Sequence, residues 1–494
     1  MPAPAVNITT AASPVPRSSP TDTGVAHVVG ISTTGPARLL TQDDACVSLQ
    51  DWLDKYGGGT LATGRATYSV DYDWVDTFFR EGGSRLYYSR VVGPTPVYAT
   101  LNLAGTGTTL VVTANEYGSH FNQFKISVIN GPVGGSGYRV VRLLANDGTT
   151  VIDQTAEFND RTAVNGVTLG GIVTITLGGG SGLPTVASAT SLASGTDDHA
   201  NITQTQVDTA LTRLNPDLGP GQVCAPNWQT SACHTSLIAH AAQYGRFALC
   251  DPTDTTVKST ILTFGTTTQG DTNSDYGALY APWITVPALS GGSTGRSVPP
   301  SALVAGKIAQ TDAAVSTSQA PAGQWGRAQY ATNVNASFSR LPQGSSDADD
   351  LSEAGVNLIV VKNGTVTVFD NLTLAAQTSE FSQIGVARWR MRTVAEVLAD
   401  ADNEMFARIN LNTLTAWKSK TDARLLRQYL NGDLFGDLDD DRPETAFNTD
   451  VDTPNTPASI NDGEMNMNIA ARPVKGGRIL NISITAVPIT GAVA

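Results

Sequence analysis

The chain has 494 residues, enough for about three domains of ordinary size. Only 15% of the residues are charged, whereas Gly (48) and Pro (25) are plentiful. This composition is typical of β-structure with many turns, and of a chain that covers part of its surface with neighbours. The formal net charge of −13 argues against a nucleic-acid partner and against docking on an anionic membrane. No stretch of about 18 apolar residues occurs, so we expect no transmembrane helix.

The N-terminal part predicts an arm followed by an α/β segment. Residues 1–20 are rich in Pro, Ala, Ser and Thr, and we expect an extended arm in which Val6 and Ile8 alternate as in a short strand. Plain disorder is the alternative for a terminus of this composition. The α/β segment covers residues 21–93. Its expected elements are a strand at 25–31, helices at 43–56 and 74–79, and a strand at 86–92.

Residues 94–200 predict a small all-β domain inserted into this α/β unit. Short strand-like segments recur here, and Asn-Gly or Asp-Gly pairs at 130–131, 147–148 and 165–166 are typical of hairpin turns. The expected strands are 110–113, 124–129, 138–144, 151–158 and 172–177.

The chain returns to an α/β pattern over residues 201–375. Val207, Ala210, Leu211 and Leu214 share one helix face, and Pro299-Pro300 favours a helix start before 301–308. Further expected elements are a helix at 236–244 and strands at 246–250, 280–286 and 358–361.

Residues 376–494 predict two long helices followed by β-structure. The helices are expected at 388–406 and 412–430. Two segments then alternate apolar and polar residues, as strands do: Met465–Ile469 and Leu480–Ala486.

Candidate catalytic and metal motifs lack the context that their chemistry needs. Ser293 lies in a G-x-S-x-G match, but a nucleophile elbow joins a strand to a helix, whereas here prolines flank a Gly/Ser loop. The residues Asp437, Asp439 and Asp441 alternate as in a calcium loop, but Arg442 replaces the required Gly. The four cysteines form no CxxC pair, so buried free thiols are expected rather than zinc. We therefore expect no catalytic residue, no metal and no cofactor.

One constellation favours a binding role. On the helix expected at 412–430, Lys420, Arg424 and Arg427 lie opposite an apolar side. A basic stripe is uncommon in so acidic a chain, and it predicts a contact with an acidic partner. A solvated helix face is the alternative.

Several segments, taken in order, resemble the tail sheath proteins of contractile phages, tailocins and related injection systems. The N-terminal motifs are VAHVVGISTTGP (25–36) and FFREGGSRLYYSRVVG (78–93), and the β-domain motif is TANEYGSHFNQFKISVI (113–129). ALYAPWITV (278–286) and VPPSALVAGKIAQTDA (298–313) follow, and the chain ends on a segment similar to the closing domain of the family. Two departures stand out: the arm lacks the usual Pro-Gly-Val-Tyr opening, and Lys475-Gly476-Gly477-Arg478 replaces a Pro-Ala-Glu stretch.

This resemblance implies an α+β and α/β multidomain fold with no enzymatic activity. It implies a subtilisin-like α/β domain (201–375, packed with 21–93), an inserted outer β-sandwich (94–200), and a C-terminal α+β sheath domain (376–494). Strand-exchanging arms are implied at both termini. The residues expected to be donated to a neighbouring subunit are Ile479, Leu480, Ile482, Ile484 and Ala486, and secondarily Val6 and Ile8.

The function implied is that of a structural subunit which polymerises helically around an inner tail tube and contracts to drive the tube through a cell envelope. The implied partners are further copies of the chain, the tube, the baseplate and the tail terminator, in a virion tail assembled in the host cytoplasm. The basic stripe would then face the tube. Two alternatives stay open: a secreted serine hydrolase using Ser293, and a surface protein that binds glycans through its β-domain.

Overall fold

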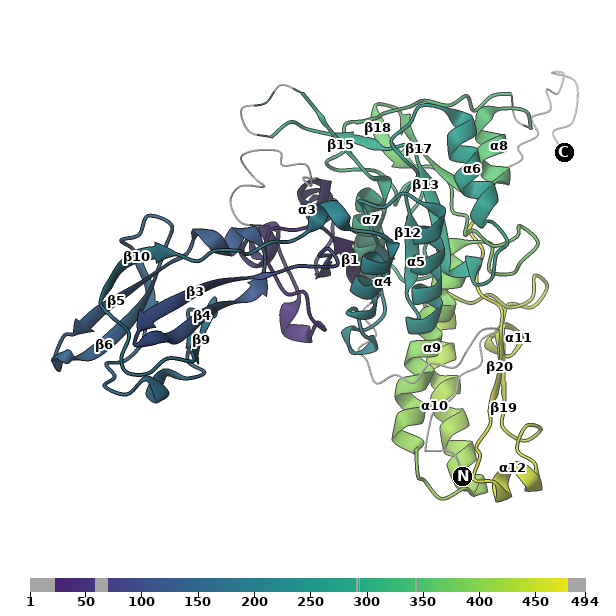
Figure 1. The fold of residues 1–494 in the computed structure, drawn as a ribbon. Coiled ribbons are helices and arrows are strands. Elements are labelled where there is room, and N and C mark those ends of the chain that lie inside the picture. Colours follow the sequence, from purple (N-terminus) through teal and green to yellow (C-terminus); the bar gives the residue numbers. More distant parts are fainter. Residues whose placement is uncertain (1–22, 58–69, 290–291, 293, 343, 479–494) are drawn as a thin grey trace, which may run out of the picture.

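The computed structural model describes residues 23–57, 70–289, 292, 294–342 and 344–478. It shows an α/β body, a β-domain that projects from one side of that body, and a pair of long helices that extends from its lower end (Figure 1). The expectation of a mixed α/β, multidomain chain is confirmed.

The body is built on one seven-stranded sheet that combines two distant parts of the sequence. Two strands precede the β-domain and five follow it. All neighbours pair in parallel except β17 and β18, which are antiparallel. In sheet order the strands are β18 (Thr365–Val368), β17 (Val356–Lys362), β13 (Gly277–Ala281), β12 (Phe247–Cys250), β11 (Gln222–Cys224), β1 (Ala26–Gly30) and β2 (Leu86–Arg90).

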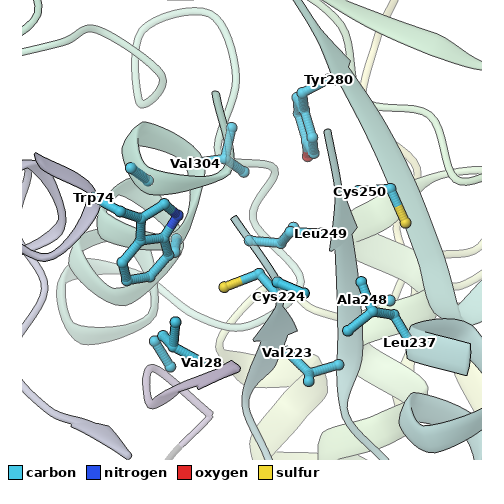
Figure 2. Close-up of a cluster of buried hydrophobic side chains, with 14 of the residues drawn as sticks. Val28, Trp74, Val223, Cys224, Leu237, Ala248, Leu249, Cys250, Tyr280 and Val304 are labelled. Atoms are coloured by element: carbon cyan, nitrogen blue, oxygen red, sulfur yellow. The ribbon is translucent and has the colours of Figure 1, made fainter. Parts of the chain in front are cut away.

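Two groups of helices pack on this sheet, so its central strands are buried on both faces. On one side, Cys224 and Leu249 point toward Trp74 and Val304, whereas on the other side Ala248 lies beside Leu237 (Figure 2). The first group holds α3 (Val70–Arg80) and α7 (Pro300–Ala314). The second holds α4 (Gln204–Thr212), α5 (Ser231–Tyr244), α6 (Lys258–Thr268) and α8 (Asp347–Glu353).

A fully buried ion pair joins the two helices of the first group. Glu81 follows α3, and one of its carboxylate oxygens lies 3.0 Å from Nζ of Lys307 on α7, with both side chains at 0% exposure. The same carboxylate accepts backbone N–H groups of Gln329, Tyr330 and Ala331 at 2.8–2.9 Å. These bonds satisfy a charge that burial would otherwise make costly, and they fix the loop after α7.

The projecting β-domain consists of two four-stranded antiparallel sheets that share one apolar core. The Asp147-Gly148 turn joins β6 to β7, and Gly148 has φ +72°, a conformation that glycine adopts without strain. One sheet holds β3 (Tyr98–Gly105), β4 (Gly107–Tyr117), β9 (Val173–Leu177) and β8 (Thr168–Leu169). The other holds β10 (Ala187–Ser191), β5 (Lys125–Gly131), β6 (Gly135–Leu144) and β7 (Val151–Gln154).

Two of the elements expected in the α/β body differ in the structure. The single helix predicted over 43–56 is instead a short turn followed by α1 (Leu49–Trp52) and a π-helical segment, because Cys46 pairs with Leu86 in extended conformation. The single strand predicted over 280–286 is divided between β13 and β14 (Ile284–Val286), which belong to different sheets. Pro282 lies between them and has no N–H to donate to a ladder.

Asp251 gives the body a pH dependence that can be measured. This buried side chain follows β12 and accepts bonds from the backbone N–H (2.8 Å) and hydroxyl (2.6 Å) of Ser301 in the first turn of α7. Burial raises the pKa of the Asp251 carboxyl to about 7, although the bonds from Ser301 act in the opposite direction. The folded state therefore binds this proton more tightly than the unfolded state, where the pKa is about 3.9.

The stability that this proton contributes is full below the unfolded pKa and is lost as the pH rises through about 7. We expect the free energy of unfolding of Asp251→Asn, measured in urea, to fall less than that of the native protein between about pH 5 and about pH 8. Equal pH slopes for the two proteins would contradict the assignment.

Candidate functional site

A pair of antiparallel helices extends from the lower end of the body and carries the basic residues singled out in the sequence (Figure 1). They are α9 (Ile384–Glu404) and α10 (Leu411–Leu430). The Asn410 side chain caps α10 by accepting the N–H of Thr413 at 3.0 Å. A helix of this length spans about 30 Å, so the pair reaches well beyond the body.

Buried arginines fasten the first turns of α9 to the body. Arg388 forms an ion pair with Asp312, just inside the end of α7, at 2.5 Å. Arg390 forms an ion pair with Asp275 at 2.6 Å, and its guanidinium lies 4.2 Å and 4.1 Å from the ring centroids of Tyr276 and Phe381. Sequence reasoning missed these contacts, and the only signal was the presence of arginines in a largely apolar helix.

A buried glutamine holds the two helices together. The Gln428 amide of α10 accepts the indole N–H of Trp389 at 2.9 Å and donates to Glu396 on α9 at 3.1 Å. A small apolar cluster of Trp389, Leu425, Leu434 and Ala446 lies next to it. Because an unpaired amide would be costly here, the network fixes one register between the helices.

The basic residues of α10 do not form one free stripe. Lys420 forms an ion pair with Glu404, and Arg424 forms one with Asp400 on the facing helix, with Nη2 and Oδ1 2.6 Å apart. Arg427 is exposed and has no ion pair within the described residues. The helical wheel of α10 placed the three residues on one side but could not show that acidic residues of α9, one turn apart, face two of them.

A two-stranded antiparallel sheet packs against α10. It consists of β19 (Phe447–Asp450) and β20 (Asn468–Ala471). Thr449 of β19 contacts Asp422 of α10, and its hydroxyl accepts from Lys418 at 2.8 Å. Expected as a strand over 465–469, the second segment begins at Asn468 in the structure.

This small sheet has open edges within the part of the chain that the structure describes. No third described strand pairs with β19 or β20, and the side chain of Ile469 is 37% exposed. Beyond β20, residues 472–474 pair with 433–435, so the edge is open along β20 itself. Unpaired N–H and C=O groups on such an edge can accept a strand from another chain.

Several predicted site residues lie outside the described residues. They are Val6, Ile8, Ile479, Leu480, Ile482, Ile484, Ala486 and Ser293.

The structure places the remaining candidate ligands in ordinary structural roles. All four cysteines are buried and free, and burial raises the pKa of the Cys233 thiol to about 12. Asp437 forms an ion pair with Arg472 at 3.5 Å, and Asp441 accepts the N–H of Gly436 at 2.8 Å. Among the described residues, no group of three or more His, Cys, Asp or Glu side chains could hold a metal ion. Within the described ranges, no helix has the length and apolar character that crossing a membrane requires.

Comparisons with known proteins identify the fold. No family model and no curated protein matches the chain. Among solved structures, the sheath tail protein of Listeria innocua matches with a TM-score of 0.61 at 14% identity, covering 88% of this chain and 89% of its own. The sheath tail protein of Desulfitobacterium hafniense matches with a TM-score of 0.56 at 13% identity, and the match covers 90% of this chain and 93% of its own.

Sheaths of injection systems match over almost the whole length. The contracted helical sheath of the anti-feeding prophage has a TM-score of 0.54 at 15% identity and covers 98% of this chain and 99% of its own. The chain therefore has the fold of contractile sheath proteins, as the resemblance in sequence predicted.

The attachment of α9 can be tested by substitution. Arg388→Met leaves the buried carboxylate of Asp312 without its cation, and we expect a loss of about 3–5 kcal/mol in the free energy of unfolding. Lys420→Met removes a more exposed pair, with Glu404 on α9, and should cost about 1 kcal/mol or less. Urea unfolding of both variants makes the comparison, and equal losses would show that the Arg388 pair does not hold the helix.

Proposed function

We propose that the chain is the subunit of a contractile tail sheath, which polymerises helically around an inner tube and contracts to drive that tube through a target envelope. The observation that carries this proposal is the match to a contracted helical sheath over 98% of the chain. The sheath would join a baseplate at one end and a tail terminator at the other. The particle would assemble in the host cytoplasm and form part of a virion tail.

In this proposal, terminal strands hold the subunits together. The open edge of β20 would accept a strand from a neighbouring subunit, with Ile479, Leu480, Ile482, Ile484 and Ala486 as the main donor residues and Val6 and Ile8 as the second set. Backbone hydrogen bonds resist separation along a ladder while they allow the joined bodies to rotate. The arms (1–20 and the terminal strand) would act as linkers, and the subtilisin-like body (21–93 with 201–375) and outer β-sandwich (94–200) would form the wall.

The helix α10 would contact the tube. Arg427 is the basic residue of the predicted set whose charge is free of intramolecular pairing in the described structure. Lys420 and Arg424 would contribute by exchanging Glu404 and Asp400 for acidic groups of the tube. Exposed ion pairs are worth about 0–1 kcal/mol each, which suits a contact that must release on contraction. The work would come from closer packing of the subunits in the contracted lattice, without nucleotide hydrolysis.

Electron microscopy of the purified recombinant chain over a range of concentrations tests the assembly. We expect hollow, ridged tubes formed without any partner, because the strand and its acceptor are on the same chain. Discrete particles that still fail to form sheaths when tube protein is added would contradict the proposal.

Charge reversal tests the tube contact separately. Arg427→Glu should fold and self-assemble normally but bind tube protein more weakly, by about fivefold for each contact of 1 kcal/mol. Lys362→Glu makes the same change on an exposed residue of β17 and should leave tube binding unaltered. Co-sedimentation with tubes measures both, and equal binding by the two variants would exclude Arg427 from the contact.

A further inference from the structure

The lower end of the α9–α10 pair in Figure 1 presents apolar side chains to solvent. The chain turns between the two helices through residues 405–410, and the side chain of Phe406 in this turn is 83% exposed. Met405 beside it and Leu411, the first residue of α10, are also exposed. We call Met405, Phe406 and Leu411 the apolar tip. Large apolar side chains that gather at the end of a projecting element are typical of an interaction surface.

The backbone at Phe406 adopts a conformation that large side chains avoid. Its φ is +63°, in the left-handed region, where a Cβ atom crowds the following carbonyl oxygen. The other non-glycine residues with positive φ in the described ranges are all small and polar: Ser194, Asp198, Asn273 and Asn363. Because asparagine or glycine would suit the isolated fold better at this position, the phenylalanine indicates a role outside that fold.

Hydrogen bonds keep the turn in one conformation. The carbonyl of Arg408 accepts from the hydroxyl of Thr413 at 2.8 Å and from the amide of Asn410 at 3.3 Å. The backbone N–H of Ala407 donates to the carbonyl of Glu404 at 3.0 Å. The apolar tip is therefore preorganised, which reduces the entropy that a partner must remove on binding.

A second apolar surface lies at the other end of α10. Leu430, the last residue of the helix, is exposed, as is Phe435, and the side chain of Leu438 is 89% exposed. The loop that carries Leu438 is itself held in place, because the hydroxyl of Thr445 donates to the carbonyl of Asp440 at 2.7 Å. We call Leu430, Phe435 and Leu438 the apolar base.

A single chain cannot place its own tip on its own base. The helix α10 separates Leu411 from Leu430 by about 28 Å along its axis, and the buried network around Gln428 fixes the helix against α9. The two surfaces can therefore meet only between different molecules. A contact that joins two different surfaces of identical chains repeats from copy to copy instead of closing as a dimer on one shared patch.

Charge favours contact between tip and base over contact between like surfaces. Arg408 lies beside the tip and Asp439 beside the base; both are exposed, and neither side chain has an ion pair within the described residues. Two tips in contact would bring two arginines together, and two bases would bring two acidic loops (437–441) together. Tip-to-base contact pairs opposite charges instead, which guides both the choice of partner and its orientation.

We infer that the apolar tip of one subunit docks on the apolar base of another, so that the α9–α10 pairs of successive subunits form a head-to-tail row. The inference rests on the proposed sheath and adds a link between subunits that is made by side chains and does not involve the termini. In this contact Phe406 and Leu411 lie against Leu438, and Arg408 faces Asp439.

Cysteine crosslinking between two preparations of the full chain tests the docking. Leu411→Cys is introduced into one preparation and Leu438→Cys into the other, and a short bis-maleimide is added after they are mixed and allowed to assemble; the four native cysteines are buried. Each chain then carries one exposed cysteine, so every crosslinked product joins two molecules. We expect the mixed product to form well above the product of either preparation alone. Val133→Cys, exposed in the turn between β5 and β6, serves as the control partner and should give only background product.

Phe406→Asn separates docking from folding. Asparagine adopts positive φ readily, so the free energy of unfolding in urea should stay equal or rise. The yield of the mixed crosslink should nevertheless fall about tenfold, because the buried ring is lost from the contact. A fall in stability together with an unchanged crosslink would show that Phe406 serves the fold alone, and would overturn the inference.

A charge exchange tests the orientation of the contact. Arg408→Glu should lower the yield of the mixed crosslink, and Asp439→Lys in the partner preparation should restore it, because the opposite charges are then exchanged. Lys362→Glu makes the same change on an exposed residue of β17 and should leave the yield unaltered.

Electron microscopy of the same mixtures distinguishes this inference from the proposed function. Sheath-like tubes without an excess of the mixed crosslink would overturn the docking and leave the sheath intact, as would a tip-to-tip product that exceeds the mixed one. A mixed crosslink without tubes, even after tube protein is added, would support the docking and contradict the sheath. Absence of both would overturn both.

Discussion

The parallel pairing of β1 with β11 is the constraint on which the rest of the molecule depends. It places Val28 opposite Cys224, residues separated by the whole β-domain, in the middle of one sheet. The inserted domain must therefore leave and return at the same edge of the body. The buried Arg90 at the end of β2 marks that place, because its guanidinium binds the carbonyl of Tyr117 at 2.9 Å and the carboxylate of Asp197.

Charged side chains inside the body fix how its parts meet. A buried ion pair contributes little net stability, since desolvation offsets the attraction, but it tolerates only one geometry. Glu81 with Lys307 joins α3 to α7, and Arg388 with Asp312 joins α7 to α9. These pairs form a continuous route from the central sheet to the helical pair. In the proposed sheath, such connections would transmit force between subunits, because an apolar interface alone can slide.

The C-terminal region combines a part that is fixed by side-chain contacts with a sheet edge that is open among the described residues. The helical pair and β19 are held by side-chain networks around Gln428 and Thr449, whereas the edge of β20 is left open. Arg478, the last described residue after β20, is bound to Asp370, which follows β18.

The sequence by itself determined the elements whose patterns are local. The strands at 26–30 and 86–90, the helices α7 and α10 and the turn at Asp147-Gly148 follow from apolar periodicity, proline at a helix start and glycine at positive φ. Only the tertiary structure decided the division of the 280–286 segment and the partners of Lys420, Arg424 and Arg478. A one-dimensional pattern records which face of an element is polar, but the charge that meets that face comes from a segment distant in sequence, and packing alone brings the two together.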